Sequence, residues 1–161
     1  MNRNVFASIL FWIITALLVA VILKFSSQNG TDSNSVSKDV VINIVGENNY
    51  NDLVNKYTED KLLFFVRKMA HFTEYFFFSL SLFMAIYFTN KLVFNLRFIY
   101  ILLFSLLGVF LLGGIDEIRQ SFSVDRTSSF IDVLIDSSGG LLALIFVYLI
   151  NLLWRKHEKR I

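Results

Sequence analysis

The sequence predicts an all-α polytopic membrane protein, with four transmembrane helices and a short amphipathic helix in the first external loop. The chain of 161 residues is 55% hydrophobic and 17% charged, with a mean hydropathy of +0.60. Soluble domains are closer to half apolar and a quarter charged. Four apolar runs reach the roughly 20 residues that a helix needs to span a bilayer, and none alternates as a membrane β-strand would. Residues 1–161 are therefore expected to form a single membrane domain.

The first apolar run, residues 5–23, is interpreted as a retained transmembrane helix. It is longer than the ~7–15 apolar residues of a signal peptide, and no small-x-small cleavage site follows it. The other predicted spans are residues 70–89, 98–115 and 133–154. In hydrocarbon these segments must be helical, because a helix satisfies its own backbone hydrogen bonds.

The polar segment 24–69 is predicted to lie outside the membrane. It opens with a Ser- and Gly-containing turn at residues 26–30. Valine and isoleucine then recur at helical spacing, which predicts a short amphipathic helix that begins near Val36 and ends at Gly46. A second helix is expected to begin near Thr58, with the Thr58 hydroxyl as its cap, and to continue unbroken into the second span. Such a helix would exceed the bilayer thickness and would project or tilt.

The distribution of basic residues predicts a cell-membrane protein with both termini in the cytoplasm. Basic residues are concentrated in the short termini and in the loop between the second and third spans (Arg3, Lys91, Arg97, Arg155, Lys156, Lys159 and Arg160). Short cytoplasmic segments carry such an excess. The net charge of +2 therefore indicates topology and contact with the lipid bilayer. It does not indicate nucleic-acid binding, because no basic groove with interleaved aromatic residues is present.

Four separate segments are predicted to deliver polar side chains to one layer at the external mouth of the bundle. A charge at membrane depth costs about 2.5–3.5 kcal/mol on insertion scales. We therefore expect the two deepest acids, Glu74 and Asp136, to face the bundle interior and to pair with His71, Lys68, Arg67 or Arg126. The glycines at 113, 114, 139 and 140 are interpreted as helix-packing positions, because small residues allow close approach in lipid.

The layer contains candidates for acid–base chemistry and for anion binding. The predicted catalytic residues have the side chains of general acids and bases; they are His71, Glu74, Asp116 and Glu117. The predicted substrate-binding residues are Lys68, Gln120, Arg126, Asp132, Ser26 and Gln28. Basic side chains suit phosphates and carboxylates, although Arg67 is expected to contact lipid head groups instead. A purely structural clamp made of the same residues is the open alternative.

No metal site and no cofactor is predicted. His71 with Glu74, Asp116 and Glu117 would offer one nitrogen and several oxygens to a divalent ion. His71 is, however, the only imidazole in the layer, because His157 lies in the tail, and the His-Glu-x-x-His pattern is absent. The chain also contains no cysteine, which excludes thiolate ligands, disulfides and a cysteine nucleophile.

Three short motifs resemble those of VanZ-like membrane proteins. Residues 67–75, RKMAHFTEY, resemble the signature (R/K)K-x-x-H-x-x-E-Y. Residues 116–140 resemble D-E-x-x-Q-x-F, an Arg, and then D-x-x-x-N-x-x-G, with Asp136 where the family commonly has Asn. The Phe-Ser-Ser-Gln turn at 25–28 also follows the first span. The three motifs match in order and spacing over nearly the whole chain.

The resemblance implies a multi-pass bacterial membrane protein of the cell envelope. The family is named after a protein associated with antibiotic resistance, against the glycopeptide teicoplanin. Our first functional hypothesis is therefore an external polar site that acts on or binds an anionic lipid, such as a lipid-linked cell-wall precursor. The alternative is a non-catalytic structural or interaction protein whose polar cluster is a helix-packing network. The sequence leaves open whether the chain is an enzyme.

Overall fold

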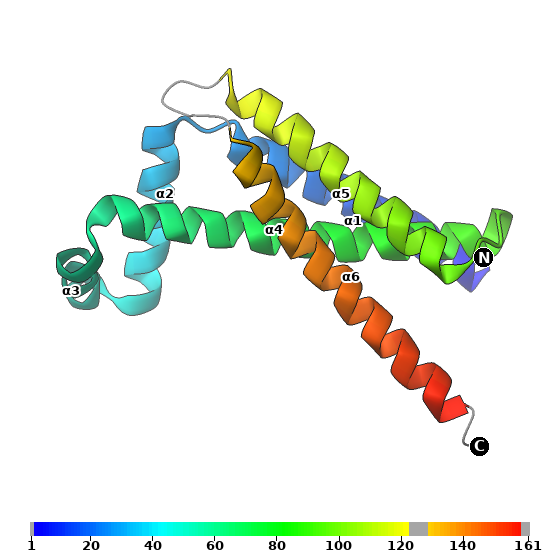
Figure 1. Cartoon of the computed structure of the whole chain (residues 1–161). Coiled ribbons are helices and arrows are strands. Elements are labelled where there is room, and N and C mark those ends of the chain that lie inside the picture. The colour runs from blue at the N-terminus through cyan, green and yellow to red at the C-terminus, as the bar shows by residue number, and fades with distance from the viewer. Residues whose placement is uncertain (1, 123–128, 159–161) are drawn as a thin grey trace.

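The computed structural model describes residues 2–122 and 129–158, and within these ranges the chain forms six helices. Four of them are long and apolar enough to cross a membrane, which confirms the predicted all-helical class. The helices are α1 (Arg3–Ser26), α2 (Gly30–Val45), α3 (Glu47–Tyr57), α4 (Glu59–Val93), α5 (Phe98–Gln120) and α6 (Phe130–Glu158) (Figure 1).

Helix α4 is the centre of the fold and contacts each of the other five helices. Helix α1 lies beside it in the opposite direction (Figure 1). Two hydroxyl pairs join α1 to α4 along their length: Ser8 Oγ is 2.8 Å from Thr89 Oγ1, and Thr15 Oγ1 is 2.8 Å from Ser81 Oγ. Hydrogen bonds of this kind hold helices together in lipid, where no hydrophobic driving force acts between them.

Two glycines of α6 are the points at which this helix packs most closely against α4 and α5. A Cβ at Gly139 would stand 2.2 Å from the carbonyl oxygen of Phe72 in α4, and one at Gly140 would stand 2.7 Å from Val109 Cγ1 in α5. The packing interpretation is therefore correct for these two glycines. It is wrong for Gly114, where a Cβ would meet nothing within 4 Å, because that side of α5 faces outward.

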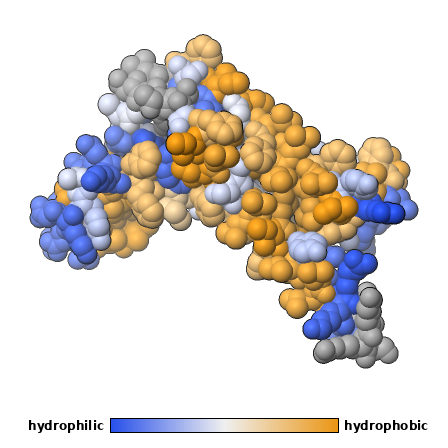
Figure 2. Space-filling model, viewed as in Figure 1, coloured by the Kyte–Doolittle hydropathy of each residue, from blue (hydrophilic) through white to orange (hydrophobic). Residues whose placement is uncertain are grey.

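The apolar residues divide between a small core and a large outer surface. Tyr75, Phe78 and Val109 belong to a buried cluster between α1, α4 and α5, whereas many large apolar side chains of the long helices are exposed. Figure 2 shows this apolar surface as a band over the long helices, between polar regions at the α2–α3 end and near the C-terminus. Such a band is the surface that a lipid bilayer covers.

The segment between α1 and α4 contains more helix than the sequence predicted. Helix α2 ends at Gly46 (φ +84°) as expected, but it begins at Gly30. Helix α3 was missed, although Tyr50, Leu53, Val54 and Tyr57 follow helical spacing. The Thr58 hydroxyl donates to the carbonyl of Tyr57 and does not cap α4, so the predicted start is correct and the predicted cap is wrong.

One carboxylate holds α2, α3 and α4 together. Glu59 Oε1 accepts a hydrogen bond of 2.6 Å from the Tyr50 hydroxyl and one of 3.0 Å from Lys38 Nζ. The bond to Glu59 raises the pKa of Lys38 above its ordinary value, and burial raises the pKa of Tyr50. Helices α2 and α3 thus pack on the first turns of α4, as Figure 1 shows.

Helix α4 is continuous over 35 residues, as predicted. At 1.5 Å per residue it is about 52 Å long, whereas the hydrocarbon core of a bilayer is ~30 Å thick. The helix therefore projects from the membrane, and its projecting end carries α2 and α3.

Candidate functional site

Most of the predicted site residues lie where α4 enters the apolar band. From His71 to Asn90, at the turn that leads into α5, the helix rises about 28 Å, close to the ~30 Å of hydrocarbon. When the Asn90 turn is at one boundary of the hydrocarbon, His71 is therefore near the other. The polar side chains that α1, α4, α5 and α6 contribute to this region are called the polar layer below. They are Ser26, Ser27, Arg67, Lys68, His71, Glu74, Asp116, Glu117, Arg119, Gln120, Asp132 and Asp136.

Two acid–base side-chain pairs in the polar layer involve α4. Lys68 Nζ is 2.6 Å from Asp132 Oδ2 at the start of α6, and the two side chains are 14% and 19% exposed. His71 Nδ1 is 3.7 Å from Glu74 Oε2 within α4. The pairing of Glu74 with His71 was one of the predicted pairs, whereas the partner of Lys68 is Asp132 rather than Glu74 or Asp136.

The end of α5 supplies three buried polar side chains to the layer. Gln120 Nε2 donates to Asp116 Oδ2 over 3.0 Å. Glu117 Oε1 accepts a hydrogen bond from the backbone N–H of Ser129, just before α6 begins. Asp116, Glu117 and Gln120 are each less than one-tenth exposed, so this end of α5 is enclosed by the bundle, and Glu117 joins it to the residue before α6.

Three of the buried side chains converge from three different helices. His71 of α4, Asp116 of α5 and Asp136 of α6 each have a nitrogen or carboxylate oxygen within 4.8 Å of the others, and all three are buried. The sequence placed these residues in one layer but did not show that they would meet. Their convergence depends on the rotation of α6, which the close approaches of Gly139 and Gly140 set.

The remaining predicted residues lie around this centre. Ser26 is fully buried at the end of α1, and Gln28 follows it in the turn before α2. Arg119 Nη2 donates to Ser27 Oγ over 2.6 Å and so joins the ends of α5 and α1. Arg126, predicted to bind substrate, lies outside the residues that the structure describes.

A cavity of about 200 Å³ opens beside the polar layer, between α1, α2 and α4. Its polar lining comes from Gln28, Ser33, Ser37, Arg67, His71 and Glu74, and its apolar lining from Phe25, Val36, Val40, Val66 and Ala70. Arg67 Nη1 donates to Asn34 Oδ1 of α2 over 3.2 Å. Sequence reasoning missed the serines of α2, for which the one-turn spacing of Ser33 and Ser37 was an available signal.

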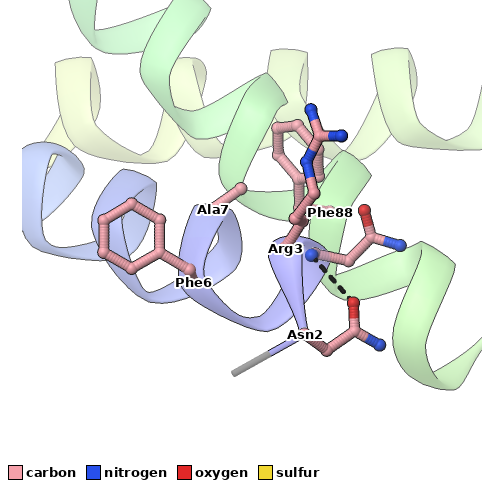
Figure 3. A pocket seen from close by; sticks show the side chains of 6 residues that line it. Asn2, Arg3, Phe6, Ala7 and Phe88 are labelled. Carbon is pink, nitrogen blue, oxygen red and sulfur yellow. Dashed lines mark hydrogen bonds between the residues drawn. The ribbon is translucent and has the colours of Figure 1, made fainter.

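A second hollow, of about 740 Å³, lies at the opposite end of α1. Its lining consists of Asn2, Arg3, Asn4, Phe6, Ala7 and Phe88 (Figure 3). The Asn2 side chain caps α1 by accepting from the backbone N–H of Asn4 over 3.1 Å. Arg3 is the one charged residue of this lining, so the hollow lacks the converging acids and bases of the polar layer.

The polar layer has more acids than bases among the residues that the structure describes. Its carboxylates are Glu74, Asp116, Glu117, Asp132 and Asp136. Lys68 forms an ion pair with Asp132, and His71 lies 3.7 Å from Glu74, while Arg67 and Arg119 donate to neutral side chains. Buried carboxylates are costly unless they are paired and hydrogen-bonded, so the contacts of these acids matter for the stability of the layer.

Comparison with known proteins identifies the family. A family model described as VanZ/LLP1 matches residues 11–151, which include all of the predicted site residues. No curated protein and no solved structure gives a significant match. The match extends over most of the chain and agrees with the motifs around His71 and Asp116. The chain belongs to the VanZ/LLP1 family.

Proposed function

We propose that this multi-pass membrane protein binds an anionic lipid-linked envelope substrate in the cavity between α1, α2 and α4, on the external side of the cell membrane. The observation that carries the proposal is the composition of the cavity wall. Apolar side chains of α2 and α4 adjoin Arg67 and the His71–Glu74 pair, a combination that suits a lipid phosphate joined to a hydrocarbon chain.

The cavity residues have distinct proposed roles. Arg67 offers a guanidinium group that can bind a phosphate with two hydrogen bonds, and Gln28, in the same lining, offers an amide donor. Val36, Val40 and Val66 provide the apolar wall for the first carbons of the lipid chain. His71 and Glu74 line the same cavity and are placed to exchange a proton with the bound head group. A protein that holds such a lipid changes the precursors that a glycopeptide reaches, which is the proposed link to teicoplanin resistance.

Binding of a polyprenyl phosphate tests the proposal. We expect the purified full chain in detergent to bind undecaprenyl phosphate, measured by native mass spectrometry, more tightly than the uncharged undecaprenol. Arg67→Gln should weaken binding ~10- to 100-fold, because a hydrogen bond to a charged group contributes about 1.5–3 kcal/mol. The matched control is Arg97→Gln, which removes an exposed arginine at the turn between α4 and α5 and should leave the affinity unchanged.

Two results would contradict this function. Equal binding of undecaprenol and its phosphate would show that the cavity does not recognise an anion. Equal effects of Arg67→Gln and Arg97→Gln would show that the phosphate is attracted by overall charge and not held in the cavity.

The proposed orientation has its own test. We expect a green fluorescent protein fused after α6 to fluoresce in the bacterial cytoplasm, and alkaline phosphatase inserted at Gly46, between α2 and α3, to be active outside the membrane. The reason is the concentration of basic residues near the termini and at the α4–α5 turn. The opposite pattern would place the polar layer on the cytoplasmic side and would remove access to external precursors.

A structural function is the second candidate, and specific contacts favour it. Lys68–Asp132 joins α4 to α6, Glu117 joins α5 to the start of α6, and Arg119–Ser27 joins α5 to the end of α1. In this alternative the chain is a non-catalytic protein whose polar layer fixes the helices. It predicts no preference for the phosphorylated lipid in the binding experiment.

A further inference from the structure

We infer that His71, Asp116 and Asp136 hold a divalent metal ion in the polar layer, of the kind that accepts both imidazole nitrogen and carboxylate oxygen, such as Mn²⁺ or Zn²⁺. Their ligand atoms lie within 4.8 Å of one another. Ligand atoms bound at ~2.1 Å are at most ~4.2 Å apart, so small side-chain rotations bring all three onto one ion. The mixed nitrogen and oxygen set favours Mn²⁺ or Zn²⁺ over the all-oxygen preference of Ca²⁺ and Mg²⁺.

The three residues are buried and have polar neighbours, as the ligands of known metal sites usually do. They come from three helices and are at most 7% exposed, so the site is fixed by the packing of the bundle. Gln120 donates to one carboxylate oxygen of Asp116. Glu74 Oε2 lies 3.7 Å from Nδ1 of His71. Carboxylates and amides in these outer positions orient the ligands of known metal sites.

Two further oxygen atoms at this place have no hydrogen-bond partner among residues 2–122 and 129–158. They are the Tyr75 hydroxyl and Ser137 Oγ, both buried. Tyr75 lies one turn below His71 and interacts electrostatically with both Asp116 and Asp136, while Ser137 follows Asp136. A Tyr75 ring carbon and Ser137 Oγ both lie within 4 Å of the point where a Cβ of Gly113 would stand. A metal-bound water would satisfy these buried groups, whose burial is otherwise costly.

A divalent ion would also stabilise two carboxylates that lie close together. Asp116 and Asp136 each place a carboxylate oxygen within 4.8 Å of the other, and both are buried, where like charges repel each other strongly. The competing arrangement is a pair of carboxyl groups that are neutralised by protons, with no metal. The two arrangements differ in metal content, so direct measurement separates them.

The test uses tag-free full chain in detergent, stripped with a chelator and titrated with MnCl₂ alone. We expect one tightly bound Mn²⁺ per chain by electron paramagnetic resonance, with a ¹⁴N coupling from one imidazole. Asp116→Asn and Asp136→Asn keep the side-chain volume and should weaken binding at least ~10-fold, since each removes a charged ligand. The control Asp52→Asn removes an exposed carboxylate of α3 and should bind as the unmodified chain does.

Absence of tight Mn²⁺ and Zn²⁺ binding by the folded chain would overturn the inference. So would wild-type affinity in Asp136→Asn, or bound Mn²⁺ without a nitrogen coupling, an outcome that is decisive even if the variants fail to fold. The experiment contains no lipid and so does not depend on the proposed function. Metal binding without recognition of undecaprenyl phosphate would refute the lipid proposal alone.

Discussion

Replacing Gly139 with Ala is expected to destabilise the fold by about 3 kcal/mol or more. The new Cβ would lie 2.2 Å from the carbonyl oxygen of Phe72, 3.0 Å from its carbonyl carbon and 3.2 Å from its Cα. These atoms belong to the backbone of α4 and cannot rotate away, so α6 must move outward. Overpacking a well-packed interface costs typically 1–3 kcal/mol, and more where the backbone resists.

The matched control for this prediction is Gly114→Ala. Both glycines lie inside membrane-spanning helices, but a Cβ at Gly114 would meet nothing within 4 Å. Because alanine favours a helix over glycine by up to ~1 kcal/mol, this variant should be neutral or slightly more stable. Reversible unfolding in mixed micelles, followed by the fluorescence of Trp12 and Trp154, measures both. Equal stabilities of the two variants would show that α6 does not approach α4 as described.

Replacing Lys68 with Met is expected to cost about 3–5 kcal/mol, because the removal of one partner leaves the other charge buried without compensation. Lys68 and Asp132 are 2.6 Å apart and mostly buried. The variant adds an uncompensated Asp132 to a layer that already contains Asp116, Glu117 and Asp136.

The double variant Lys68→Met/Asp132→Leu tests the cause of that loss. It removes both charges, so it should recover much of the stability lost in the single variant. Unfolding in mixed micelles measures the free energy of unfolding of the double variant and of each single variant. If the double variant is as unstable as the sum of the two single variants, the residues act independently and the ion pair does not hold α4 to α6.

The sequence was sufficient to predict that polar residues of different helices lie at the same end of the bundle. Consecutive spans cross the membrane in opposite directions, so polar residues at the start of one span and the end of the next must share a side. This reasoning placed His71, Asp116 and Asp132 in one layer. Apolar runs also predicted the long helices, because unpaired backbone groups are excluded from hydrocarbon.

The rotation of each helix was not predictable in this way. The partner of Lys68 and the meeting of Asp136 with His71 depend on which side of α6 faces α4, and the contacts of Gly139 and Gly140 determine that side. Helix α3 was missed because its polar composition hid a helical spacing. The sequence could not show that α2 lines the cavity, because an amphipathic helix at the surface can pack against any of several neighbouring helices.

Because the length of α4 is fixed, the amount of water around the polar layer should depend on the thickness of the surrounding lipid bilayer. The ~28 Å between His71 and Asn90 nearly equals the hydrocarbon thickness of a typical membrane. Longer fatty acids would draw His71 and Glu74 below the boundary, where water is scarce and the attraction between charges is stronger. Shorter fatty acids would lift them into the head-group region. A membrane whose acyl-chain length changes with temperature would therefore also change the environment of this site.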